Sequence, residues 1–176
     1  MNKKRSTIIA GLLIIAAAIA GWQVFASRSI PEEQIPRPAS GVLIGNTLAE
    51  FKLADLSGKQ VSVGIPGKIT VINFWATWCP PCRAEMPELE AFALKHGSQI
   101  AFYAINIQES RDTVQEFLKQ NKLTMPVLLD EQGETARKFR VSAIPTTVIS
   151  DKQGIIRFRK SGTVTLSELE GIIKGF

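Results

Sequence analysis

Two cysteines are the residues of this 176-residue chain best suited to chemistry, and they stand close together in Trp78-Cys79-Pro80-Pro81-Cys82. On a helix, a spacing of three residues puts the two sulfurs about one turn apart, where a disulfide can form and break without large backbone movement. A thiolate is the attacking species in thiol–disulfide exchange, and a second thiol nearby can resolve the mixed disulfide that forms. The pair therefore predicts a redox-active dithiol.

The residues between the cysteines indicate the direction of the redox reaction. If Cys79 occupies the N-cap of a helix, the helix dipole stabilises its thiolate. Pro80 and Pro81 have no backbone N–H to offer the sulfur, so only the amide of Cys82 remains within reach. Fewer donors mean a less stable thiolate, and a strong oxidant needs a stabilised reduced form. The sequence therefore predicts a reductant.

Other functions of the cysteine pair are disfavoured by its surroundings. A purely structural disulfide would close too short a loop to constrain the chain much. A copper-binding chaperone would need a further ligand, and the sequence offers only Met86 and His96, the latter roughly 20 Å away along the helix. A thiol peroxidase would need Pro and Thr or Ser where Ile72 and Ala76 stand. We expect no metal and, without a Gly-rich nucleotide loop, no cofactor.

Glu85 is the candidate proton carrier, because it lies three residues after Cys82 and so on the same face of the helix. Its carboxyl group could exchange protons with the thiols if burial raises its pKa. The alternative is a solvated glutamate that the helix dipole favours near the N-terminus.

The periodicity of the chain predicts alternating strands and helices that position these residues. The buried, β-rich run Ile69–Trp75 leads directly to the cysteines. We expect strands at 49–56, 60–63, 69–75, 100–107, 126–130, 146–150 and 155–159, and helices at about 79–95, 111–121, 134–139 and 166–174. Alternating strands and helices indicate an α/β domain, here with a mixed sheet because the last two strands form a hairpin.

The amino-terminal segment predicts export. Residues 1–5 form a basic flank, and 22 uncharged residues follow at 6–27, long enough as a helix for about 33 Å of bilayer. We expect a single transmembrane anchor with the basic flank in the cytoplasm. A cleaved signal peptide is the alternative, because Val24-Phe25-Ala26 resembles a cleavage site. Residues 28–41, with three prolines, are expected to form a tether to a domain at 42–176.

The net charge of +5 does not indicate a nucleic-acid binder. Three of the basic residues lie in the amino-terminal flank, and the chain from Arg28 onward has 18 basic residues against 16 acidic ones. The positive charge therefore orients an anchor instead of forming a patch for phosphates.

The run Val71-Ile72-Asn73-Phe74-Trp75-Ala76-Thr77-Trp78-Cys79-Pro80-Pro81-Cys82 resembles the active-site strand, turn and helix of thioredoxin-fold proteins. Three further features narrow the resemblance to the membrane-anchored TlpA/ResA-like thiol-disulfide oxidoreductases, over residues 42–176: Arg83-Ala84-Glu85-Met86-Pro87, Ile144-Pro145-Thr146-Thr147 and the exported anchor. The resemblance implies a thioredoxin-like fold with an N-terminal β-hairpin and a central helix-strand insertion, matched here by Arg111–Asp130.

The resemblance also implies roles for individual residues. Cys79 would be the nucleophile, Cys82 the resolving thiol and Pro145 a cis-proline lying against the pair. Glu85 matches a glutamate of the ResA-like group, whereas Asn73 stands where thioredoxins carry a buried aspartate.

Because members of this family typically act as reductants outside the cytoplasmic membrane, the resemblance implies that this chain is a dithiol reductase there. Its substrate would be an exported protein disulfide such as that of apocytochrome c, and its electron donor a membrane thiol-transfer reductase. A disulfide oxidase or isomerase with the same residues, and a copper-binding chaperone, stay open as alternatives.

Overall fold

The fold is organised around strand β5 (Ile69–Trp75), whose seven residues are all buried. The computed structural model describes residues 39–176, so the predicted basic flank, the predicted transmembrane segment at 6–27 and all but the last three residues of the predicted tether at 28–41 lie outside the described residues. Among the residues described, no helix combines the length and apolar character needed to cross a membrane.

A seven-stranded mixed sheet runs in the order β4-β3-β7-β6-β5-β8-β9. The remaining strands of this sheet are β3 (Phe51–Asp55), β4 (Gln60–Val63), β6 (Ile100–Ile107), β7 (Val127–Asp130), β8 (Thr146–Ser150) and β9 (Ile156–Ser161). Strands β5, β6 and β7 are parallel, whereas β3–β4, β3–β7, β5–β8 and β8–β9 pair antiparallel. The predicted mixed sheet is therefore confirmed, with a hairpin at each edge.

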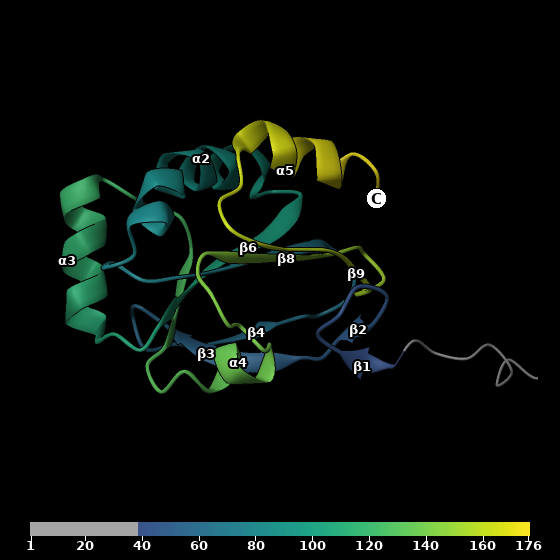
Figure 1. Cartoon of the computed structure of the whole chain (residues 1–176), viewed down its shortest axis with the longest axis horizontal. Coiled ribbons are helices and arrows are strands. Elements are labelled where there is room, and N and C mark those ends of the chain that lie inside the picture. Colours follow the sequence, from purple (N-terminus) through teal and green to yellow (C-terminus); the bar gives the residue numbers. More distant parts are fainter. Residues whose placement is uncertain (1–38) are drawn as a thin grey trace, which may run out of the picture. The chain divides into compact units, whose positions relative to one another are not determined.

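Helices cover the two faces of this sheet unequally (Figure 1). The helices are α2 (Pro80–His96), α3 (Arg111–Asn121), α4 (Glu134–Lys138) and α5 (Leu166–Ile173). Helices α2 and α5 lie side by side on one face, and α4 packs against the core cluster of the other face (Figure 1). Helix α3 and strand β7 together form the expected insertion after β6.

The alternation of side chains along β5 builds a core on each face. Val71 and Trp75 join a cluster with Leu89 of α2 and Leu169 of α5, and all four side chains are fully buried. On the other face, Ile72 and Phe74 belong to a second cluster that includes residues of β7, α4 and β9. Strand β5 is thus fixed on both sides, and its end is a rigid base for the cysteine pair.

A short parallel pair, β1 (Ser40–Gly41) and β2 (Thr47–Leu48), precedes the main sheet and has no counterpart among the predicted elements. Each strand has only two residues, too few to produce a periodic pattern in the sequence. The other predicted elements are present, with ends that coincide with the predicted ones or differ from them by one or two residues.

Candidate active site

The two cysteines lie where β5 passes into α2 and are joined by a disulfide. Cys79 is the N-cap of α2 and Cys82 stands in its first turn, with 5.3 Å between their Cα atoms. Cys79 is 3% exposed and Cys82 is fully buried. The dithiol therefore sits at a helix N-terminus on a rigid strand end, with Cys79 as the more accessible sulfur.

The N-cap geometry expected for Cys79 is present. Its Sγ accepts a hydrogen bond from the backbone N–H of Cys82 at 3.3 Å. Pro80 and Pro81 occupy the first two positions of α2 and cannot donate. A thiolate on Cys79 would therefore have one backbone donor from the first turn of the helix.

The loop before β8 lies against this sulfur. The peptide bond between Ile144 and Pro145 is cis, and the carbonyl oxygen of Ile144 is 3.7 Å from Sγ of Cys79. Pro145 itself is buried. The family resemblance implied Pro145 for this place, and the fold brings the neighbouring Ile144 carbonyl to Cys79 across 65 residues of chain.

Glu85 is buried behind the pair, only 3% exposed, so the alternative of a solvated glutamate is wrong. Its Oε1 accepts from Nδ2 of Asn73 at 2.9 Å, and its Oε2 accepts from the backbone N–H of Val164 at 2.8 Å. Burial raises the pKa of the Glu85 carboxyl, against the opposing effects of these two hydrogen bonds and of the positive charge of Lys160. The carboxyl thus holds a proton to higher pH than an exposed glutamate.

Asn73 is a site residue whose role the sequence did not show. Besides Glu85, its Nδ2 donates to Oγ1 of Thr147 at 3.1 Å, while its buried Oδ1 has no hydrogen-bond partner among the described residues. The only available signal was an amide side chain in a buried strand whose other residues, apart from Thr70, are apolar. Such a residue must find partners on the neighbouring strand and helix.

A second hydrogen-bond network, also missed from the sequence, holds the turn before Cys79. The Glu109 carboxylate accepts from the backbone N–H of Thr77 at 2.7 Å, from the Thr77 hydroxyl, and from Nδ2 of Asn106 at 2.7 Å. These contacts tie the turn to the end of β6. The site is therefore braced from β6 as well as from β5 and β8.

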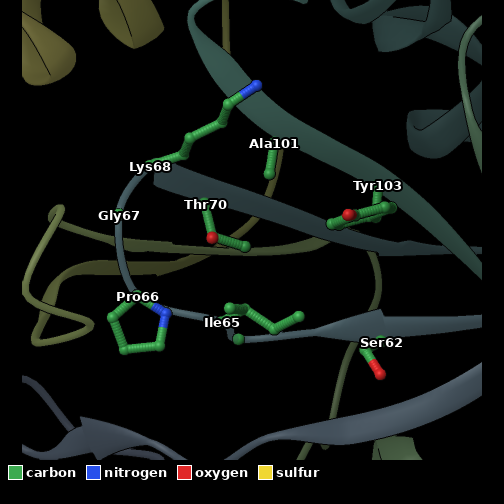
Figure 2. A pocket seen from close by; sticks show the side chains of 9 residues that line it. Ser62, Ile65, Pro66, Gly67, Lys68, Thr70, Ala101 and Tyr103 are labelled. Atoms are coloured by element: carbon green, nitrogen blue, oxygen red, sulfur yellow. The ribbon is translucent and has the colours of Figure 1, made fainter.

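A polar groove of about 540 Å³ lies beside the pair, between the start of α2 and α3, with Thr77, Arg83 and Phe117 among its lining residues. Another hollow, of about 430 Å³, lies at the opposite end of β5 (Figure 2). There Thr70 and Tyr103 stand on the strands above Ile65 and Pro66, and no thiol or acid lines the hollow. Of these two hollows, the polar groove is the one whose lining residues Thr77 and Arg83 flank the cysteine pair in the chain.

His96, the only histidine, lies at the far end of α2 and bonds to Glu170. Within residues 39–176, no group of three or more His, Cys, Asp or Glu side chains is arranged to hold a metal ion. The arrangement that the described residues do form is a dithiol with a buried carboxyl group beside it, which suits two-electron exchange with another disulfide.

Comparison with known proteins agrees with this chemistry. Residues 44–159 match the AhpC/TSA family. The chain is 35% identical to the thioredoxin-like protein YneN of Bacillus subtilis, covering 90% of this chain and 91% of YneN. It is 32% identical to the sporulation thiol-disulfide oxidoreductase A of the same organism, over 69% of this chain and 76% of that protein. It is 28% identical to the thiol-disulfide oxidoreductase ResA of Geobacillus kaustophilus, over 96% and 94%.

Solved structures share the same architecture. The crystal structure of StoA from Bacillus subtilis matches with a TM-score of 0.63 and 31% identity, covering 70% of this chain and 95% of StoA. A putative thiol:disulfide interchange protein DsbE from Chlorobium tepidum matches with a TM-score of 0.69 and 25% identity, over 77% and 98%. The predicted thioredoxin-like fold is therefore confirmed.

Proposed function

Since this chain belongs to the AhpC/TSA family of thioredoxin-fold proteins and is a thiol-disulfide oxidoreductase, we propose that it works as a dithiol reductase of exported protein disulfides. Two observations made together carry the proposal. The sulfur of Cys79 accepts a hydrogen bond from a single backbone amide of the helix, and the buried carboxyl of Glu85 lies one turn beyond Cys82. The first feature favours a reductant, and the second supplies a proton carrier where the resolving thiol is buried.

The reaction begins with the reduced pair. The Cys79 thiolate attacks one sulfur of the substrate disulfide, which forms a mixed disulfide and releases the other substrate sulfur as a thiolate. Cys82 then gives up its proton and attacks Sγ of Cys79, which forms the Cys79–Cys82 disulfide and releases the second substrate sulfur. Two electrons pass from the protein to the substrate, which leaves with two thiols.

Glu85 serves the second step in this proposal. Because Cys82 is fully buried, water cannot easily take its proton. The Glu85 carboxylate accepts that proton and later returns it to solvent or to the leaving substrate sulfur. Pro145 positions the loop whose Ile144 carbonyl lies beside Cys79, so an incoming disulfide meets the sulfur at this edge.

The cellular context is part of the proposal. Residues 6–27 would anchor the protein, with the domain on the outer side of the cytoplasmic membrane and residues 28–41 as the tether. An oxidised apocytochrome c is the proposed substrate, and a membrane thiol-transfer reductase the proposed electron donor. The support is the amino-terminal pattern together with the relatives named as thiol-disulfide oxidoreductases.

Trapping tests the proposed substrate and residue roles. In the full-length chain, Cys82→Ser should accumulate mixed disulfides on Cys79, and mass spectrometry should identify exported proteins there. Cys79→Ser is the matched control and should accumulate none. Recovery of equal adducts from both variants would contradict the assignment of Cys79 as the nucleophile.

The reduction potential tests the direction of the reaction. Equilibration with glutathione should give a potential well below the −120 mV that is typical of a strong oxidant. Pro81→Ala restores a backbone N–H at the second helix position, and one charge-assisted hydrogen bond should raise the potential by about 30 mV. A wild-type potential near −120 mV would instead identify the alternative, a disulfide oxidase or isomerase.

A further inference from the structure

A row of polar side chains crosses three strands beneath Glu85. Asn73 of β5 is in register with Thr147 of β8, and Thr147 is in register with Lys160 of β9. Residues in register on neighbouring strands share one face of the sheet. This face carries α2 and α5, so the row leads from the hydrogen-bond partner of Glu85 to a lysine on the edge strand.

Lys160 is held in place by α5. Its Nζ donates to both carboxylate oxygens of Glu168, each at 2.9 Å. The two side chains are partly open to solvent, 38% exposed for Lys160 and 32% for Glu168. Glu168 follows the N-cap Thr165 in the same loop-to-helix segment whose Val164 amide bonds to Glu85. The ion pair and the buried carboxyl therefore belong to one connected structure.

The positive charge of Lys160 acts on the Glu85 carboxyl group. This charge favours the ionised form of the Glu85 carboxyl, in opposition to burial. Two acidic groups lie on the helices around this site: Glu88 of α2, three residues after Glu85, accepts from the Leu166 amide at 2.7 Å, and Glu168 of α5 pairs with Lys160. The row residues on β5 and β8, Asn73 and Thr147, are uncharged. Lys160 is thus the cation among these neighbours.

We propose that the Lys160–Glu168 ion pair sets the protonation of Glu85: Lys160 is a positioning residue that stabilises the carboxylate, and Glu168 limits that effect by pairing with the ammonium group. The proposal rests on the role given above to Glu85 as the proton acceptor of Cys82. A half-exposed pair at the sheet edge would in this way control proton transfer at a dithiol to which it is not bonded. Interactions through a partly buried region are screened less than those at an open surface.

Two substitutions should have opposite effects. Lys160→Met removes the cation, so Glu85 should hold its proton to higher pH. Glu168→Gln leaves Lys160 without its counter-charge, so Glu85 should release its proton at lower pH. A merely structural role for the pair would change stability in the same direction in both variants and would not produce opposite titration shifts.

The direct measurement is the ¹³C chemical shift of the Glu85 carboxyl in the oxidised full-length protein, followed against pH. The disulfide does not titrate, so the curve reports Glu85 and its charged neighbours alone, with Glu85→Gln to assign the signal. We expect a higher midpoint for Lys160→Met, a lower one for Glu168→Gln, and a wild-type midpoint for Lys160→Arg. Unchanged midpoints, or shifts of the same sign in the first two variants, would overturn the proposal.

Kinetics supply the second readout. Single-turnover reduction of a short peptide with one intramolecular disulfide should depend on Glu85 ionisation in the resolving step. Below the midpoint, Lys160→Met should slow that step roughly threefold and Glu168→Gln should accelerate it by a similar factor. The Glu85→Gln background should abolish both effects.

A matched control lies on the same pair of helices. Lys95 at the far end of α2 donates to Glu170 of α5 at 2.6 Å, so Lys95→Met breaks a comparable ion pair away from Glu85 and should leave the midpoint unchanged. If the wild-type protein reduces no disulfide, the proposed function fails, while the titration of the oxidised form still decides the inference. If Lys160→Met does not fold, Glu168→Gln alone decides it by the sign of its shift.

Discussion

Glu85 combines two properties that oppose each other: it is almost fully buried, and both of its oxygens accept hydrogen bonds from N–H donors. Burial disfavours the carboxylate, whereas the donors favour it. Burial is the larger effect, and the pKa of Glu85 is raised. A carboxyl in this balance changes its protonation in response to small changes in nearby charge, which a proton carrier for a dithiol requires.

The raised pKa makes folding stability depend on pH. The contribution of Glu85 is fully present below the carboxyl pKa of the unfolded chain, about 4.3, and is lost as the pH rises through the higher folded-state pKa. Glu85→Gln removes this titration. We therefore expect the free energy of unfolding to shift in favour of the variant between pH 4 and pH 8, by about 1.4 kcal/mol for each tenfold difference between the two proton-dissociation constants.

Urea unfolding of the oxidised protein at several pH values measures this effect. The unpartnered Oδ1 of Asn73 can accept from the new amide group if the Asn73 side chain turns, which keeps the site satisfied. Glu88→Gln is the control, because the bond that the Glu88 carboxylate accepts within residues 39–176 comes from the Leu166 amide instead of from Asn73. A stability difference that stays constant with pH would show that Glu85 titrates in the folded protein as it does in the unfolded one.

Single residues were predictable where the sequence places them near each other. Cys79, Cys82 and Glu85 follow from spacing along one helix, and Pro145 from a resemblance that covers both segments. Asn73, Thr147 and Lys160 were not predictable as a group, because their proximity depends on the register of three strands. A bulge between Ile149 and Ser150 shifts the register of β8 against β9, and no residue pattern in the sequence predicted this bulge.

At the scale of elements, α2 acts as a frame that holds two loops through its glutamates. Glu85 and Glu88 accept from the backbone amides of Val164 and Leu166, at the start of α5. Glu90 accepts from the backbone amides of Thr124 and Met125 and from the Thr124 hydroxyl, in the loop between α3 and β7. The helix that carries the dithiol therefore also fixes the inserted segment and the last helix.

Glu90→Ala should loosen the loop between α3 and β7. Three donors lose their acceptor, and the Met125 side chain next to them is buried, so we expect a loss of about 1–3 kcal/mol in the free energy of unfolding. Hydrogen exchange at the amides of Thr124 and Met125 should accelerate more than exchange in β5. Glu88→Ala removes one acceptor from one donor and should cost less, and equal losses in the two variants would contradict this role of Glu90.

Most elements were predictable because their apolar residues repeat with the period of a helix or a strand. Their neighbours were less predictable. Strand β3 pairs with β7 as well as with β4, and only Ala54 and Asp55 make the second pairing. A contact of two residues across more than 70 positions does not affect local periodicity. The pairing of the β3–β4 hairpin with β7 could therefore not be predicted from the sequence.

At the scale of the whole molecule, the excess positive charge and the hydrophobic core lie in different parts of the chain. The basic flank accounts for three of the five net positive charges, and the chain from Arg28 onward is nearly neutral. Both core clusters draw their buried members from residues between Leu48 and Leu169. The part that carries the chemistry thus contains its own core, whereas the basic flank before the proposed anchor carries the charge that would orient that anchor.

This division predicts that a chain beginning at residue 38 folds and exchanges disulfides without the amino-terminal segment. Residues 38–176 form one compact unit, and the truncation retains the bond from the Thr47 amide to the Ala39 carbonyl. Its free energy of unfolding should therefore be within about 0.5 kcal/mol of that of the full-length chain. Its single-turnover rate with a peptide disulfide should be unchanged at each pH.

Only membrane association should be lost on truncation, because the proposed anchor at 6–27 supplies it. Fractionation of cells that express each form should find the full-length chain in the membrane fraction and the truncated chain outside it. Retention at the membrane with a mature N-terminus at Met1 would support the anchor, whereas a mature chain beginning at Ser27 would identify the cleaved signal peptide. A truncated chain that still sediments with membranes would show that the domain itself binds them, through a surface that its near-neutral charge does not predict.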